Sequence, residues 1–130
     1  MKKRLNCIRI LAVACGLLFG GAAMAQELSK VDTRHVAVKL DNDTLQVTEV
    51  TLKPGEKLPL HTHPAYTVYT IYGGTVRLAY RGGKTEDVVW DHGDVLYGDP
   101  EGPHTTENVG KTTVKILLVE IKVVAAAKKK

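Results

Sequence analysis

Short runs of alternating or β-branched residues recur along the chain from Lys30 onward, with turn-forming residues between them. No window of ten or more residues in this part repeats its apolar positions with the helical period, whereas a period of two is typical of half-buried strands. The pattern predicts strands at residues 34–40, 45–52, 66–72, 75–80, 87–90, 94–97, 104–108 and 113–123. The pairs Gly73-Gly74 and Gly82-Gly83 fit two-residue hairpin turns, because glycine adopts positive φ at little cost.

The number and length of these strands predict the fold class. Eight short antiparallel strands in about 100 residues suit a small barrel or jelly roll, whose closed or stacked sheets avoid long open edges. The sequence contains no recognisable linker between two such units. We therefore expect a single all-β domain over residues 26–130.

The first 25 residues have the features of a secretory signal peptide. Basic residues at positions 2, 3, 4 and 9 precede an apolar run over residues 10–21, and Ala23-Met24-Ala25 is a small-x-small cleavage site. The uncharged stretch 10–25 is shorter than the roughly 20 residues that span a membrane. We expect cleavage before Gln26, a periplasmic or secreted product, and no membrane attachment after cleavage.

Cleavage at this site changes both the charge and the cysteine content of the chain. Four of the 18 lysines and arginines but none of the 14 acidic residues precede Gln26, so the remainder carries 14 charges of each sign. The basic balance of the precursor is therefore no argument for nucleic-acid binding, and we expect no nucleic-acid partner. Cys7 and Cys15 also precede the cleavage site, which excludes disulfides, thiolate catalysis and thiolate metal ligands in the exported chain.

Three histidines are candidates for a metal site. His61 and His63 are one residue apart, and side chains alternate along a strand, so both rings are expected on one side. His104 follows a rigid turn at 100–103 and is expected at the start of a strand that faces the pair across the barrel interior. A single buried histidine is more often a hydrogen-bonded core residue, but three in this all-β context favour a metal.

The histidines lie within two motifs that resemble those of the cupins. The first comprises Gly55, His61, His63, Thr67 and Gly74, and the second comprises Gly93, Pro100, Gly102, His104 and Asn108. The resemblance implies a double-stranded β-helix barrel with a central metal, held by two His and a Glu of the first motif and a His of the second. Here the three His are matched, but Thr67 stands at the position of the Glu, and the neighbouring Val68 cannot replace it.

The missing Glu changes the chemistry that the resemblance implies. Three neutral histidines bind Fe(II), Zn, Ni, Mn or Cu but supply no anionic ligand, so a chelating anionic substrate would restore the balance of charge. Three-His cupin-like oxygenases, such as cysteine dioxygenase and the diketone-cleaving dioxygenase, imply a dioxygenase-like reaction on a small organic substrate. Two alternatives stay open: a non-catalytic cupin that binds or senses a small ligand or sugar, and a metal-independent isomerase-like cupin.

Three further residues are expected at or near the pocket. The hydroxyl of Thr67 is too short to reach the metal, so it is expected to hold a metal-bound water or orient a His ring, or else only to pack in its strand. Tyr69 has the same parity as His61 and His63, which makes it the best pocket candidate among the tyrosines. Asn108 is expected to bond backbone groups at a strand end.

The resemblance also implies a homodimer, for which segment 34–40 is the candidate interface.

Overall fold

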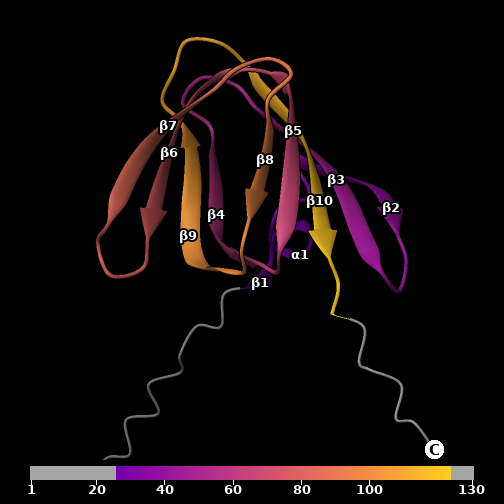
Figure 1. Ribbon diagram of the computed structural model, residues 1–130. Helices are drawn as coiled ribbons and strands as arrows, with labels where there is room; N and C mark the ends of the chain where they lie inside the picture. The colour runs from indigo at the N-terminus through magenta and orange to yellow at the C-terminus, as the bar shows by residue number, and fades with distance from the viewer. Residues whose placement is uncertain (1–25, 124–130) are drawn as a thin grey trace, which may run out of the picture.

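The computed structural model describes residues 26–123, which contain ten strands and one short helix (Figure 1). In chain order these are β1 Gln26–Glu27, α1 Leu28–Val31, β2 Val36–Asp41, β3 Leu45–Leu52, β4 Lys57–His63, β5 Tyr66–Tyr72, β6 Gly74–Tyr80, β7 Thr85–Trp90, β8 Val95–Gly98, β9 Glu101–Asn108 and β10 Val114–Ile121. The all-β prediction is confirmed. The predicted signal peptide at 1–25 lies outside the described residues, and no helix within 26–123 is long and apolar enough to cross a membrane.

The strands form two five-stranded sheets that enclose the interior between them (Figure 1). One sheet has the order β1-β4-β9-β6-β7 and the other the order β2-β3-β10-β5-β8. Apart from the parallel pair β1 and β4, neighbouring strands are antiparallel. The chain passes from one sheet to the other at every link except β2–β3 and β6–β7. Residues distant in sequence therefore become neighbours in each sheet.

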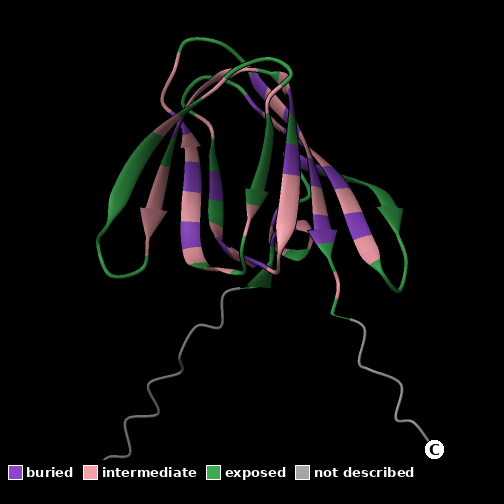
Figure 2. Cartoon of the chain, in the orientation of Figure 1, coloured by how far each residue is buried: buried purple, intermediate pink, exposed green. Residues whose placement is uncertain are grey.

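The hydrophobic core lies on the inner faces of the sheets. Buried positions alternate with partly exposed ones along β3 and β10, and Figure 2 shows this banding on both strands and on β9. Val50 and Leu52 from β3 and Val114 and Leu118 from β10 are all at most 3% exposed. Complete burial of such a side chain contributes about 1.5–3 kcal/mol, so these two paired strands are a main source of stability.

Two strand predictions were wrong around the histidines. Residues 57–63 were missing from the predicted strands, although the argument for His61 and His63 assumed extended backbone there, and they form β4. The register shifts between Leu58 and His61, and Pro59 is tolerated at such an irregularity because no regular ladder hydrogen bond is lost there. Strand β9 begins at Glu101, so segment 101–103 is part of the strand and not of a turn.

The two glycine pairs differ in their roles. Gly82 and Gly83 have φ of 114° and 98° in the β6–β7 hairpin, as predicted, although that loop is longer than two residues. Gly73 and Gly74 do not form a hairpin turn, because β5 and β6 belong to different sheets and neither glycine has positive φ. A Cβ on Gly73 would collide with the carbonyl oxygen of Trp90, and one on Gly74 would lie 2.7 Å from Cγ2 of Val114. Because neither glycine has a side chain, the link between β5 and β6 can lie close to the backbone of Trp90 and to Val114.

Candidate metal centre

The three predicted histidines converge in the interior. His61 and His63 are on β4 and His104 is on β9, and their exposed fractions are 0%, 9% and 2%. The ring centroids are 4.4 Å apart for His61 and His104, 4.8 Å for His61 and His63, and 5.3 Å for His63 and His104. One ligand atom from each residue lies within 4.8 Å of the other two, so the group could hold a metal ion.

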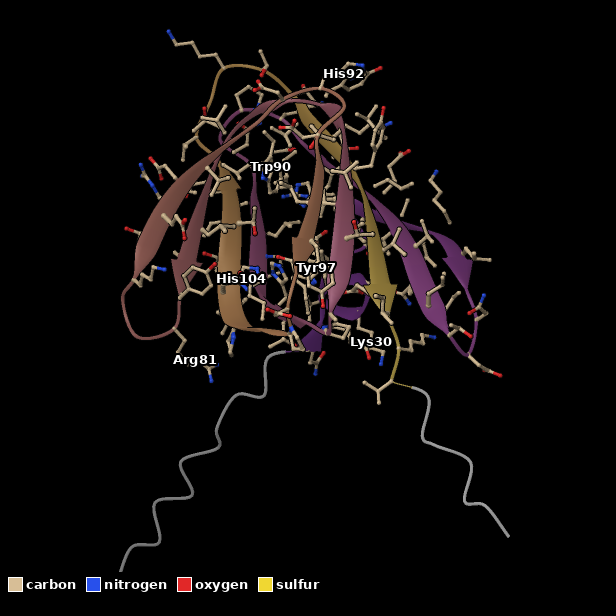
Figure 3. The ribbon with its side chains drawn as sticks, in the orientation of Figure 1. Lys30, Arg81, Trp90, His92, Tyr97 and His104 are labelled. Carbon is tan, nitrogen blue, oxygen red and sulfur yellow. The ribbon has the colours of Figure 1, made fainter. Side chains whose placement is uncertain are left out.

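The route by which His104 reaches the pair differs from the prediction. Strands β4 and β9 are hydrogen-bonded neighbours in the same sheet, and His61 is the register partner of His104. His104 therefore approaches from the side and not across the barrel, and it is the fourth residue of its strand, not the first. Figure 3 shows it between the two sheets beside β9, whereas His92 lies at the rim.

Each of the three rings is oriented through its Nδ1 atom. Nδ1 of His61 lies 2.6 Å from the carbonyl oxygen of Pro59, and Nδ1 of His104 lies 2.8 Å from that of Gly102. A carbonyl oxygen only accepts, so both Nδ1 atoms donate and, in the neutral ring, Nε2 keeps a lone pair. His63 Nδ1 lies 2.6 Å from Oε1 of Glu120, and an ionised carboxylate accepts in the same way. This outer support is typical of metal-binding histidines.

The protonation and burial of the rings fit metal binding. Burial lowers the pKa of His61 to about 3 and also lowers the pKa of His104, so both rings are neutral at pH 7, as ligation requires. Nε2 of His61 is buried and has no hydrogen-bond partner among the described protein atoms. An unsatisfied buried acceptor costs roughly 1–3 kcal/mol, and a bound cation would satisfy it.

Two carboxylates beside the histidines were not predicted from the sequence. Glu120, on β10, is 5% exposed in its side chain and supports His63. Glu101, on β9, accepts hydrogen bonds from the hydroxyls of Tyr66 at 2.9 Å and Tyr80 at 2.6 Å, and its Oε2 lies 3.7 Å from Nε2 of His104. The available signal was the position of Glu101 three residues before His104 in the second motif.

The contacts of Glu101 keep it ionised. Burial by itself would raise the pKa of this carboxyl, but the hydrogen bonds from Tyr80 and Tyr66 oppose it, and the pKa is lowered. Burial, together with the hydrogen bonds to Glu101, raises the pKa of Tyr66 and of Tyr80, so both phenols stay protonated donors. Two neutral donors therefore hold the negative charge of Glu101 beside the histidines.

A mostly apolar cavity of ≈ 50 Å³ adjoins the histidines. Its walls include Leu28 from α1, Leu78 from β6 and Trp90 from β7, and its polar lining is the three histidines, Tyr66, Glu101 and Thr106. No lysine or arginine lines it within the described chain. A cavity of this size holds a few water molecules, so only a small molecule would fit it.

The structure places Thr67 and Tyr69 outside this cavity. Side chains of β5 alternate, with Val68 and Thr70 buried, while Tyr69 is 43% exposed and Thr67 Oγ1 donates to the carbonyl oxygen of Leu96 at 2.7 Å. Neither residue lines the pocket, so both pocket expectations are corrected. The parity argument failed because the chain changes sheets between β4 and β5, and Tyr66 takes the place expected for Tyr69.

Asn108 is structural, as the strand-end argument predicted. Its amide nitrogen donates to the carbonyl oxygens of Leu52 and Thr112, each at 2.8 Å, and its Oδ1 accepts from the backbone of Gly110 at 3.0 Å. It is fully buried but is not among the residues that line the cavity. Asn108 therefore joins three backbone segments and does not contact the histidines as a pocket residue.

Comparison with known proteins decides the family. The family model of the cupin domain matches residues 48–120, more than half of the chain. The chain belongs to the cupin family. Among solved structures, a cupin-domain protein from Bordetella pertussis Tohama I is 25% identical with a TM-score of 0.63, over 68% of this chain and 92% of that one. No curated protein sequence matches.

Other solved structures agree with this assignment. An RmlC-like cupin family protein from Methanocaldococcus jannaschii, described as a double-stranded β-helix, has a TM-score of 0.54 at 16% identity over 70% of this chain and 84% of that one. A predicted oxalate decarboxylase from Thermotoga maritima is 29% identical with a TM-score of 0.50, over 68% and 79%. This cupin is therefore a double-stranded β-helix, as the resemblance implied.

Proposed function

We propose that this cupin binds one divalent transition metal, Fe(II), Zn, Ni, Mn or Cu, through Nε2 of His61, His63 and His104. The observation that carries the proposal is the shared orientation of the rings. All three Nδ1 atoms are engaged by oxygen acceptors, so three Nε2 lone pairs are left for one cation. The unpartnered, buried Nε2 of His61 supports it further.

We further propose an oxygenase-like reaction on a small organic substrate. A bound transition ion would supply a Lewis-acidic or redox-active centre there. The chain's own residues contribute three things. Pro59, Gly102 and Glu120 fix the ligand rings, the apolar walls exclude water, and Glu101 presents an ionised carboxylate to the cavity. Because the Thermotoga maritima neighbour is a predicted oxalate decarboxylase, small organic acids are the first class to screen.

Metal content tests the first part directly. Protein purified without a histidine tag is expected to contain one transition metal per chain, and His61→Ala and His104→Ala are expected to lose it. His92→Ala is the matched control, because His92 is exposed and its ring bonds the carbonyl oxygen of Ile71, away from the three histidines. A metal-free wild type that takes up no divalent ion would reject the metal centre and favour the ligand-binding or isomerase-like alternatives.

We also propose export and dimer formation. The basic start, apolar run and Ala23-Met24-Ala25 site support cleavage. Mass spectrometry is expected to show that the exported form begins at Gln26.

Strand β2 supports a homodimer, because it is at the edge of its sheet and exposes Val38 and Leu40, each by 50%. Light scattering is expected to give twice the mass of the chain for the wild type. For Val38→Lys it is expected to give the mass of a monomer.

A further inference from the structure

We propose that Glu101 is a fourth metal ligand, which supplies from β9 the carboxylate that this chain lacks in its first motif. This inference rests on the proposed metal centre and adds to it a residue from a different strand. Thr67, at the position of the missing Glu, bonds Leu96 and does not line the cavity. No side chain of β5 therefore offers a carboxylate to the histidines, whereas β9 does.

The strand register places Glu101 with the histidines. On the paired strands β4 and β9, His61 is opposite His104 and His63 is opposite Glu101. Four potential ligands thus form two facing pairs, and all four line the same cavity. The arrangement results from the shifted register between His61 and His63, which keeps both pairs on one face of the sheet.

One distance suits a shared cation. Oε2 of Glu101 lies 3.7 Å from Nε2 of His104, and two atoms that each bind a tetrahedral metal at about 2.1 Å lie about 3.4 Å from one another. The ligand atoms that all lie within 4.8 Å of one another belong to the three histidines, so the carboxylate of Glu101 would move toward His61 and His63 when the ion binds. The hydrogen bonds from Tyr66 and Tyr80 do not prevent this, because a carboxylate has about four lone-pair sites.

A cation would also suit the chemistry of the facing atoms. His104 donates through Nδ1 to Gly102, so in the neutral ring its Nε2 presents a lone pair to the carboxylate of Glu101. Two acceptors that face each other in a buried site repel, unless a positive charge lies between them. The two phenols hold Glu101 in this otherwise unfavourable position. A metal bound by both atoms removes the repulsion.

A ligand at Glu101 changes the expected substrate. Three neutral histidines leave both positive charges of the ion uncompensated, but a carboxylate cancels one of them, so an anionic substrate is no longer needed for balance. An oxygen ligand also favours the harder ions Mn(II) and Fe(II) over a purely nitrogen site. The apolar cavity without lysine or arginine agrees with a neutral or singly charged substrate.

The test compares Mn(II) and Zn(II) binding to metal-stripped wild type, Glu101→Gln and Glu107→Gln by calorimetry. Glu107→Gln is the matched control, since it removes the same charge from the same strand at an outward position beside Lys57. Glu101→Gln is expected to weaken Mn(II) binding by at least about 10-fold, with Zn(II) less affected. Glu107→Gln is expected to match the wild type. Circular dichroism checks that each variant is folded.

A second variant separates a ligand from a nearby charge. Glu101→Asp keeps the charge but withdraws the oxygens by one methylene, so a ligand is lost while a general electrostatic effect persists. The Mn(II) affinity of Glu101→Asp is expected to fall as far as that of Glu101→Gln. The Cu(II) spin-resonance spectra of both variants are expected to differ from the spectrum of the wild type. Wild-type affinity in Glu101→Gln overturns this inference and leaves the three-histidine site intact, whereas a wild type that binds no metal overturns both.

Discussion

His61 on β4 lies opposite His104 on β9, with the two ring centroids 4.4 Å apart. The two residues are 43 positions apart in sequence but are joined by one antiparallel strand pair. A hydrogen-bonded pair of strands fixes the separation of facing side chains more tightly than packing between sheets does. The candidate metal centre therefore depends on the β4–β9 register, and changes that disturb this pair are expected to affect metal binding first.

Glu120 is expected to control metal affinity through His63. Its carboxylate lies 2.6 Å from Nδ1 of His63 and fixes both the tautomer and the ring direction. Replacing such a partner costs on the order of 10–100-fold in metal affinity. We expect this loss for Glu120→Gln in a Zn(II) titration. Glu49→Gln is expected to bind as the wild type does, because Glu49 is a partly exposed residue on the neighbouring strand β3 that pairs with Lys115 and not with a histidine. Equal affinity of the two variants would exclude this role.

Metal-free protein is expected to lose stability as the pH falls below about 6.5. The ordinary pKa of histidine is near 6.5, but burial lowers that of His61 to about 3 and also lowers that of His104. Between these values the unfolded chain binds more protons than the folded chain, so stability rises with pH. Urea midpoints of metal-stripped protein should therefore decrease from pH 7 to pH 5. A flat or opposite trend would show that these rings are not buried in neutral form.

Thr67→Glu is expected not to strengthen metal binding. Thr67 does not line the cavity and its hydroxyl bonds the carbonyl oxygen of Leu96, so a Glu there would not reach the histidines. Mn(II) affinity measured for Thr67→Glu should match that of Thr67→Gln, which has the same size without the charge. A gain specific to the Glu variant would mean that β5 presents this position to the metal.

Gly73→Ala is expected to destabilise the fold. The added Cβ would collide with the carbonyl oxygen of Trp90, where the chain crosses between the sheets. Overpacking of this kind costs about 1–3 kcal/mol, which thermal or urea unfolding can resolve. Gly102→Ala is the control, because a Cβ there meets nothing within 4 Å and the residue has no positive φ. Similar stability of the two variants would contradict the close approach.

Local patterns were sufficient to predict the all-β class and the convergence of the three histidines. Period-two alternation marks strands such as β3 and β10 because each has one buried face. His61 and His63 are separated by one residue, which places their side chains on the same face of any strand. Asn108 was also predictable, because a short amide at a strand end bonds nearby backbone whatever the distant sequence is.

The remaining features depend on long-range register, which local patterns do not contain. Tyr69 was assigned to the wrong face because the count of alternating positions was carried through the crossing from β4 to β5. Glu101 was missed because its importance arises from pairing with His63 and from the hydroxyls of Tyr66 and Tyr80. The first case shows that a turn between sheets resets which side chains face inward, and the second shows that strand pairing brings together residues that are distant in sequence.

A crystal structure of metal-loaded protein, with anomalous data at the absorption edge of the metal, tests the central claim most directly. We expect one anomalous peak in the barrel, with Nε2 of His61, His63 and His104 each at about 2.0–2.2 Å from it. Nδ1 of each ring should keep its present oxygen partner. A peak at another place, or His61 and His104 turned so that Nε2 does not meet the ion, would contradict the account.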